Sequence, residues 1–312
     1  FTAGAVYTAI KKRENKKPDV AVLYSDLPCS CAACFTTNKF CAAPVILDRE
    51  ILKKGKARAV VINSGNANAA TGKQGIEDAR TVEREAEKLL GLGEDEVFVC
   101  STGVIGQRLP VDKVLQGIRE IIPAKLAKEN GSEAAYAIMT TDTRKKEVAV
   151  QFEIGGKTVT VGGMCKGSGM IHPNMCTMLS FVTTDIAISK ELLQEALSAD
   201  VKDTYNMISV DGDTSTNDTC LLLANGMAGN AEITEKNADY EEFCKALNYV
   251  NETLAKKMAG DGEGCTALFE VKVIGAESKE QAVTLSKSII TSSLTKAAIF
   301  GHDANWGRIL CA

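Results

Sequence analysis

Short apolar runs alternate with amphipathic segments along the whole chain, and no repeat, low-complexity tract or long linker interrupts them. Buried strands are expected at residues 20–23, 59–63 and 97–100, where an apolar run ends in a polar or glycine-containing turn. Two further strands are expected at residues 219–224 and 267–273. This alternation of strands and helices predicts an α/β or α+β protein.

The clearest helix lies between the second and third of these strands, and Gly91 follows it as a natural C-terminal stop. Its apolar stripe consists of Ile76, Ala79, Val82, Ala86, Leu89 and Leu90. A second amphipathic helix is expected after Pro110, and later helices at residues 190–199, 240–258 and 278–293. Residues 147–154 and 157–161 flank Gly155-Gly156, a two-residue turn that admits positive φ, and therefore predict a hairpin.

A loop loosened by glycines follows the hairpin and leads into an apolar strand. Residues 166–176 read Lys-Gly-Ser-Gly-Met-Ile-His-Pro-Asn-Met-Cys, and Thr177 opens the strand. A threonine hydroxyl is a weak nucleophile unless a base lies beside it, and cleavage before Thr177 would supply a free α-amine with a pKa of about 8. The local pattern alone favours a plainer interpretation, a Gly-Pro turn that enters a core strand.

Composition is that of an ordinary globular protein. With 45% hydrophobic residues and a net charge of −4, the chain shows no sign of a nucleic-acid or membrane surface. It contains no run of eighteen or more uncharged apolar residues, which a membrane span would need. We therefore expect a cytoplasmic protein that binds neither nucleic acid nor membrane. Because the chain begins at Phe1 and stops within an apolar segment at residues 309–312, we expect one or both ends of the natural protein to be missing.

Eleven cysteines are present, and Cys29, Cys31, Cys34 and Cys41 lie close together in the sequence. A zinc site would need a second cysteine pair or histidines, yet the chain has only two histidines and its later cysteines are scattered. Reduced, partly buried thiols are therefore favoured over a metal site, and disulfides are not expected in a reducing compartment.

Three other segments carry candidate chemistry. Residues 65–74 resemble a phosphate-binding loop but have the wrong glycine spacing, and Gln74 stands where a hydroxyl residue would hold Mg²⁺. Residues 211–216 begin like a calcium loop but lack its glycine, and they fit a polar active-site edge better. Ser101-Thr102-Gly103 follows the third strand, where a hydroxyl and backbone N–H groups can form an oxyanion hole, although a plain turn is the commoner outcome.

The segment at residues 163–179 closely resembles the self-cleavage segment of the ornithine acetyltransferase family, also called glutamate N-acetyltransferase. Further segments resemble that family in the family's own order, and together they span nearly the whole chain. They lie at residues 35–38, 42–45, 63–68, 101–106, 139–143, 209–218, 260–264 and 300–308.

The resemblance implies an enzyme of arginine biosynthesis whose precursor cleaves itself between Cys176 and Thr177. An N-terminal subunit of residues 1–176 and a C-terminal subunit of residues 177–312 would stay together, in a heterotetramer of two of each. Thr177 would take the acetyl group from N2-acetylornithine, release ornithine and pass the acetyl group to glutamate by ping-pong transfer. The cycle needs no metal or other cofactor, although acetyl-CoA can serve as donor where the enzyme is bifunctional.

Site residues implied by the resemblance include Thr102 and Gly103, which would stabilise the tetrahedral oxyanion. Substrate contacts would come from Thr141, Lys166, Thr177 and Glu263, with Thr140 an open alternative to Thr141. A lysine can hold the α-carboxylate of ornithine, and a glutamate can bind its δ-ammonium. The implied fold is a layered α-β-β-α sandwich of the DmpA/ArgJ-like type, distinct in topology from the N-terminal-nucleophile hydrolases.

Two features depart from the family pattern. The family usually has alanine before the nucleophile, whereas this chain has Cys176, and we expect cleavage to survive the change. Family members also continue beyond the motif at residues 305–308 into a segment that contributes an asparagine and a hydroxyl residue to the substrate site, so the C-terminal subunit is expected to lack its last part. A self-cleaved amidohydrolase or aminopeptidase, with water as acceptor, is the alternative function.

Overall fold

Two β-sheets face each other at the centre of the protein. The computed structural model describes residues 1–12, 14–172 and 178–312. The first sheet has four strands in the order β1-β2-β4-β5, of which only β4 and β5 run parallel to each other. Its strands are β1 (Thr2–Val6), β2 (Val20–Tyr24), β4 (Ala59–Asn66) and β5 (Val97–Val104).

The second sheet has five strands in the order β3-β9-β8-β7-β6, and its one parallel pair is β8 and β9. Its strands are β3 (Ser30–Phe35), β6 (Lys146–Ile154), β7 (Lys157–Lys166), β8 (Leu179–Thr184) and β9 (Thr219–Ala224). The strand that follows the glycine-containing loop at residues 166–176, β8, is therefore an interior strand of this sheet.

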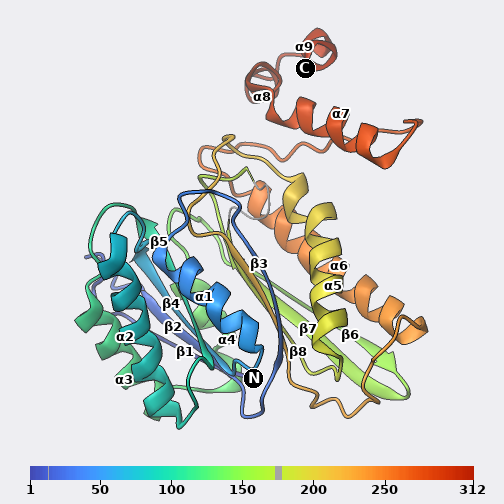
Figure 1. Cartoon of the computed structure of the whole chain (residues 1–312). Helices are drawn as coiled ribbons and strands as arrows, with labels where there is room; N and C mark the ends of the chain where they lie inside the picture. The colour runs from blue at the N-terminus through green and yellow to red at the C-terminus, as the bar shows by residue number, and fades with distance from the viewer. Residues whose placement is uncertain (13, 173–177) are drawn as a thin grey trace.

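Helices cover the outer faces of both sheets and close the space between them (Figure 1). The helices α2 (Gly72–Leu90) and α3 (Val111–Ala124) pack on the first sheet, and α5 (Lys190–Asp203) and α6 (Ala238–Ala259) pack on the second. The shorter α1 (Ala43–Lys54) contacts the edge strands β5 and β3, while α4 (Gly131–Ala137) contacts β1 and β6 at the opposite edges. This arrangement confirms the expected layered α-β-β-α sandwich.

Alternating side chains of β9 show how the layers are filled. Leu221 and Leu223 belong to the core between the two sheets, whereas Leu222 and Ala224 belong to the core beneath α5 and α6. A strand that is buried on both faces needs a continuous apolar run rather than alternation, which is what residues 219–224 have. Among the described residues, no helix is both long enough and apolar enough to cross a membrane.

Most of the expected elements are confirmed. The strands expected at residues 20–23, 59–63, 97–100 and 219–224 lie within β2, β4, β5 and β9, and the long helices correspond to α2, α3, α5 and α6. Gly91 ends α2 in the left-handed conformation, at φ 66°, and its N–H bonds to the carbonyl of Glu87. Gly155 and Gly156 have φ values of 56° and 72° and join β6 to β7 as the predicted hairpin turn.

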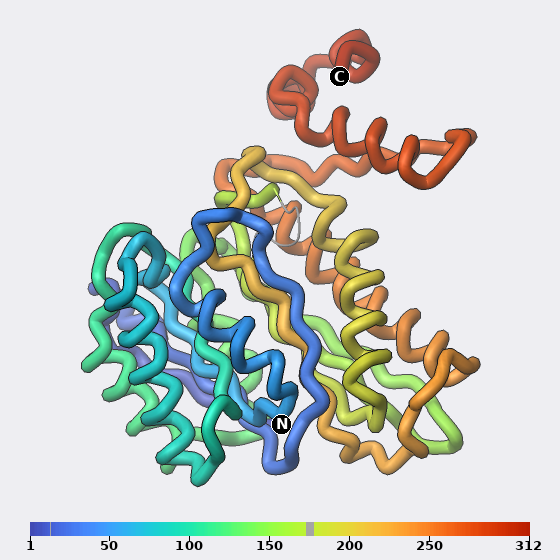
Figure 2. The backbone as a smooth tube through the Cα atoms, viewed as in Figure 1, coloured from blue at the N-terminus to red at the C-terminus, as the bar shows by residue number. Residues whose placement is uncertain are grey.

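The strand expected at residues 267–273 is wrong. This segment has no regular structure and connects the sandwich to α7 (Lys279–Thr291), which was expected as a helix, and to two short helices, α8 (Ser293–Phe300) and α9 (Trp306–Cys311). These helices lie apart from the sandwich (Figures 1 and 2). Alternation of apolar and polar residues specifies the two faces of a strand but not a partner, and no strand of either sheet pairs with this segment.

Candidate active site

The ends of three strands meet at a small cavity of about 20 Å³. Thr102 lines it from near the end of β5, Lys166 from the end of β7, Leu179 from the start of β8, and Met178 from the position directly before β8. The remaining lining residues come from two loops: Gly169, Met170, Ser215, Asn217 and Asp218. The predicted nucleophile Thr177 and its neighbour Cys176 lie outside the described residues, but Met178, the next residue in the chain, lines this cavity.

Backbone packing at the end of β5 requires a glycine at position 103. Gly103 has φ +135°, and a Cβ there would lie 2.3 Å from the carbonyl carbon of Gly65 and 2.5 Å from the backbone nitrogen of Asn66. The ladder between β4 and β5 is irregular at these same residues. Only a residue without a side chain can therefore bring the two strands this close. The predicted oxyanion residue Gly103 thus lies directly after Thr102 in a tightly fixed backbone.

Lys166 and Thr102 lie in contact at the cavity. The Lys166 ammonium donates a hydrogen bond of 3.2 Å to Thr102 Oγ1, and both side chains are buried. Because an ammonium can only donate, Thr102 Oγ1 is the acceptor and its own hydrogen remains able to donate to another group. Burial lowers the pKa of Lys166, while the nearby Asp142 carboxylate opposes this shift. The pair presents a cation and a hydroxyl donor where negative charge would be stabilised.

Asn217 ties this edge of the first sheet to the start of β9. Its Nδ2 donates to the carbonyl of Ser101 at 2.8 Å and to the carbonyl of Ala67 at 2.6 Å, and Asn217 is buried. The hydroxyl of Ser101 in turn donates to Asn63 Oδ1 at 2.7 Å. These bonds hold the Ser-Thr-Gly segment in place from both sides.

Asp211 holds the loop that follows β7. Its carboxylate accepts hydrogen bonds from the backbone N–H groups of Met170 (2.6 Å) and Ile171 (3.0 Å). Val210 N–H donates to the carbonyl of Ile171 at 2.6 Å. Within residues 211–216, Ser215 lines the cavity and Asp211 holds Met170, which also lines it, so this polar segment adjoins the cavity.

The two remaining predicted substrate residues, Glu263 and Thr141, lie on loops. Glu263 donates its backbone N–H to the carbonyl of Ser168 at 3.1 Å, and a Cβ added to Gly169, which lines the cavity, would lie 2.6 Å from Glu263 Oε1. The Glu263 carboxylate is thus directly against the cavity's rim. Thr141 is exposed and does not line the cavity, and Thr140 is partly buried, so the contacts do not decide between them.

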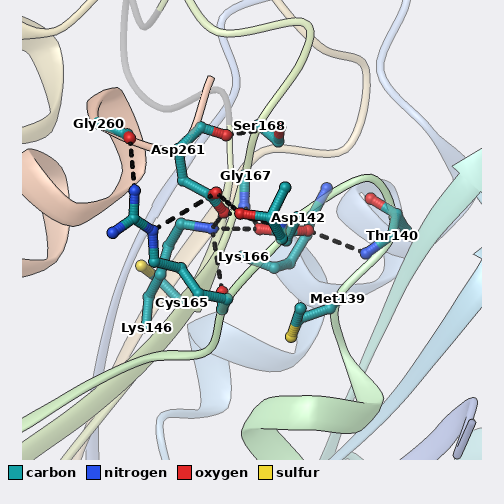
Figure 3. A network of polar contacts seen from close by, with 12 residues as sticks. Met139, Thr140, Asp142, Lys146, Cys165, Lys166, Gly167, Ser168, Gly260 and Asp261 are labelled. Atoms are coloured by element: carbon teal, nitrogen blue, oxygen red, sulfur yellow. Dashed lines mark hydrogen bonds and ion pairs between the residues drawn. The ribbon is translucent and has the colours of Figure 1, made fainter. Parts of the chain in front are cut away.

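A buried ion cluster that was not predicted from the sequence lies beside these loops (Figure 3). Lys146 Nζ lies 2.6 Å from Asp142 Oδ1 and 2.6 Å from Asp261 Oδ2, and all three side chains are buried. Burial would raise the pKa of Asp142, but the charges of Lys166 and Lys146 outweigh it and the pKa lies below its usual range. For Asp261, burial likewise opposes a lowering of the pKa that the hydrogen bond from Lys146 chiefly causes. Both carboxylates are therefore ionised at neutral pH.

The cysteine cluster is divided between layers. Cys31 and Cys34 both lie on β3, but Cys31 faces the core between the sheets and Cys34 faces the core beneath α5 and α6. Burial raises the pKa of Cys29 and of Cys34 to about 11, so these thiols stay protonated at neutral pH. Within residues 1–12, 14–172 and 178–312, no three histidine, cysteine, aspartate or glutamate side chains are grouped as metal ligands would be.

Comparison with known proteins identifies the family of this chain. A profile of the ArgJ family matches residues 2–312. The chain is 55% identical to the arginine biosynthesis bifunctional protein ArgJ of Caldanaerobacter subterraneus subsp. tengcongensis, a match covering 100% of this chain and 76% of that protein. It is 54% identical, over the same shares, to ArgJ 1 of Clostridium acetobutylicum.

Two solved structures resemble part of the fold. ArgJ of Bacillus halodurans superposes with a TM-score of 0.52 at 42% identity, over 56% of this chain and 90% of that one. The ornithine acetyltransferase of Mycobacterium tuberculosis, crystallised with ornithine, superposes with a TM-score of 0.50 at 37% identity, over 55% of this chain and 91% of that one. Sequence and structure agree, and this chain belongs to the ArgJ family.

Proposed function

We propose that this protein is a self-activating acetyltransferase of arginine biosynthesis that moves the acetyl group of N2-acetylornithine to glutamate through Thr177. The observation that carries the proposal is the Lys166–Thr102 hydrogen bond in a cavity that Met178, the neighbour of Thr177, also lines. Membership of the ArgJ family and the likeness to an ornithine-bound acetyltransferase support the same substrate class.

Self-cleavage is the first step of the proposal. The Thr177 hydroxyl attacks the carbonyl carbon of Cys176, the peptide C–N bond breaks, and the acyl group moves from nitrogen to oxygen as an ester. Water then hydrolyses the ester, which leaves a carboxylate on Cys176 and a free α-amine on Thr177. The Thr102 hydroxyl and the Gly103 N–H are the donors proposed for the oxyanion of each tetrahedral intermediate.

Acetyl transfer uses the α-amine that cleavage has freed. This amine accepts the hydroxyl proton of Thr177 while the oxygen attacks the acetyl carbonyl, and the proton then passes to the departing amine of ornithine. The amine of glutamate attacks the resulting acetyl ester and restores the hydroxyl. We assign the substrate α-carboxylate to Lys166, the δ-ammonium of ornithine to Glu263, and a hydrogen bond to Thr141. Because the similar proteins are named bifunctional, acetyl transfer from acetyl-CoA to glutamate is a second activity to assay.

The strand order explains how two subunits, residues 1–176 and 177–312, would remain together after cleavage. Strands β8 and β9 follow the cleavage point, and they lie between β3 on one side and β7 on the other, both of which precede it. Separation would break the β7–β8 and β3–β9 ladders and expose both cores of the second sheet. Assembly of two such pairs as a heterotetramer is part of the proposal.

Ornithine release from N2-acetylornithine, measured with and without glutamate, tests the proposed function. A transferase releases ornithine continuously only when glutamate is present, because the acetylated enzyme otherwise accumulates. Sustained release without glutamate would show a hydrolase that uses water as acceptor, and absence of release under both conditions would contradict both functions.

A further inference from the structure

Lys146 is a fully buried lysine whose hydrogen-bonding capacity is met inside the protein (Figure 3). Its Nζ bonds to Asp142 Oδ1 and to Asp261 Oδ2 at 2.6 Å each, and the carbonyl of Arg144 lies at 3.5 Å. An ammonium has three N–H donors, so these three acceptors account for all of them. Lys146 is therefore not available to bind a substrate directly, and any role it has is exerted through its two carboxylate partners.

Asp142 connects the turn that carries Thr141 to the strand end that carries Lys166. Its Oδ2 accepts the backbone N–H of Thr140 at 2.9 Å, and its Oδ1 accepts the backbone N–H of Gly167 at 2.8 Å. Gly167 directly follows Lys166, so the position of Asp142 fixes the backbone from which the Lys166 side chain extends.

Asp261 makes the matching connection to the loop that carries Glu263. Its Oδ2 accepts the backbone N–H of Thr143 at 3.0 Å, and its backbone carbonyl accepts the hydroxyl of Ser168 at 2.7 Å. The carbonyl of Ser168 accepts the backbone N–H of Glu263 at 3.1 Å. The cluster thus joins the three chain segments to which we assign the substrate contacts.

Lys166 is close enough to this cluster to be affected by its charge. Asp142 is the carboxylate with the largest effect on the pKa of Lys166, and Lys166 is the cation with the largest effect on Asp142. Nevertheless, Lys166 forms no ion pair within the described part of the chain, and its ammonium bonds to Thr102 Oγ1. A buried ammonium pairs with a neighbouring carboxylate that lacks a counter-ion, and Asp142 Oδ1 is already occupied by Lys146 and by Gly167 N–H.

We propose that Lys146 is a positioning residue for the substrate site: by pairing with Asp142 and Asp261 it prevents Asp142 from capturing Lys166, and so keeps the Lys166 ammonium at Thr102, where it can bind a carboxylate. This inference rests on the proposed function for the identity of the ligand. Lys146 would thus affect ligand affinity although it does not line the cavity.

Two double variants with matched charges test the inference. Lys146→Met with Asp261→Asn leaves Asp142 without a counter-ion near Lys166, whereas Lys146→Met with Asp142→Asn removes Asp142 and leaves Asp261. Asp218, which lines the cavity together with Lys166, is present in both variants. Each removes one positive and one negative charge. Asparagine at 261 keeps the acceptor for the Thr143 N–H, whereas asparagine at 142 has one oxygen for the Thr140 and Gly167 N–H groups, so the folded fraction of each variant is measured first. Lys190→Met serves as a control, because Lys190 binds the carbonyls of Leu52 and Lys53 at the end of α1, away from the cluster.

Ornithine affinity of the purified mature protein, measured by calorimetry, is the main readout. The variant that keeps Asp142 should bind ornithine about 10- to 100-fold more weakly than the wild type, which corresponds to loss of one hydrogen bond to a charged group. The Lys190→Met control should stay within about 3-fold of the wild type. The variant that keeps Asp261 should bind ornithine more tightly than the variant that keeps Asp142, because it has no Asp142 carboxylate to pair with Lys166. A merely structural role lowers the folded fraction of the double variants and leaves the affinity of the folded protein unchanged, so equal affinities of the two double variants would overturn the inference.

Crystal structures of the two double variants separate this inference from the proposed function. The inference predicts that Lys166 Nζ lies at hydrogen-bond distance from Asp142 when Asp261 and Lys146 are replaced, whether or not the protein binds ornithine. Lys166 remaining at Thr102 in that variant would contradict it. If neither double variant folds, Lys146→Gln alone provides the test, because it removes the ammonium and keeps an amide donor for the carboxylates: a 10-fold or larger loss of ornithine affinity supports the inference, and affinity near that of the wild type opposes it. Failure of the wild type to bind ornithine would instead count against the proposed function.

Discussion

Replacing Thr102 by valine removes one hydroxyl from the candidate active site while keeping the size and branching of the side chain. In the wild type, Thr102 Oγ1 accepts the hydrogen bond of 3.2 Å from the Lys166 ammonium, and its own hydrogen is the donor proposed for the oxyanion. The valine variant loses both functions at once. Thr102→Ser keeps the hydroxyl and is the matched control.

Two free energies follow from these contacts. Loss of one oxyanion donor lowers kcat about 100- to 1,000-fold, or roughly 3–4 kcal/mol of transition-state stabilisation. Loss of the acceptor for a buried lysine costs about 1–3 kcal/mol of folding free energy. Because domains are stabilised by about 5–15 kcal/mol, Thr102→Val should remain folded while its activity falls by orders of magnitude.

Ornithine release from N2-acetylornithine in the presence of glutamate measures the fall in kcat, and urea unfolding measures the loss of folding free energy. Self-cleavage should slow as well, since it passes through the same kind of intermediate, so the fraction of cut chain is determined by mass spectrometry and kcat is calculated per cut chain. A Thr102→Val enzyme with kcat within about 3-fold of the wild type would refute the assignment. So would a Thr102→Ser enzyme as impaired as the valine variant.

Three further outcomes are expected. Gly103→Ala should destabilise the fold by more than the roughly 1–3 kcal/mol that a side chain costs at positive φ, because the added Cβ would also clash with the β4 backbone. Gly106→Ala is the control in urea unfolding: Gly106 has φ +80° but no atom near the added Cβ, so this variant measures the cost of positive φ alone. Burial raises the pKa of Glu83, in α2, to about 7, so between about pH 4.5 and 7 the folded state holds a proton that the unfolded state has lost, and the free energy of unfolding should fall as pH rises through this range. Glu83→Gln should flatten this part of the plot of unfolding free energy against pH, and an unchanged slope would contradict the raised pKa. Asn217→Ala should cost about 2–4 kcal/mol in thermal or urea unfolding, since it leaves two buried carbonyls without their donor, and a cost near zero would show that these bonds are replaced.

Long periodic segments were the elements that the sequence predicted well. The helix α2 has a clear apolar stripe and a glycine stop, and β9 has a continuous apolar run that suits a strand buried on both faces. The strand β3 was not predicted, because its sequence, Ser-Cys-Ala-Ala-Cys-Phe, is made mainly of small residues that have little strand preference of their own. Its structure comes from pairing with β9, a contact nearly two hundred residues away that no local pattern encodes.

Site residues could be named from the sequence but not placed relative to one another. Thr102 and Lys166 are far apart in the chain, and only the facing ends of β5 and β7 bring them into contact. Lys146 was missed for a related reason: it stands in a run of charged residues that reads as solvated surface, and its complete burial depends on Asp261 more than a hundred residues later. Asp142 and Asp261 both lie in segments that resemble the family, at residues 139–143 and 260–264. Charged residues inside these two segments were therefore the sequence feature that could have pointed to the cluster.

Mass spectrometry of the purified protein, after incubation with N2-acetylornithine alone, tests the central claim most directly. We predict two chains, one ending at Cys176 and one beginning at Thr177, with a single acetyl group on Thr177 that disappears when glutamate is added. Thr177→Ala should yield one intact chain that takes up no acetyl group. Two chains from Thr177→Ala, or an acetyl group on another residue of the cut wild-type enzyme, would contradict the account.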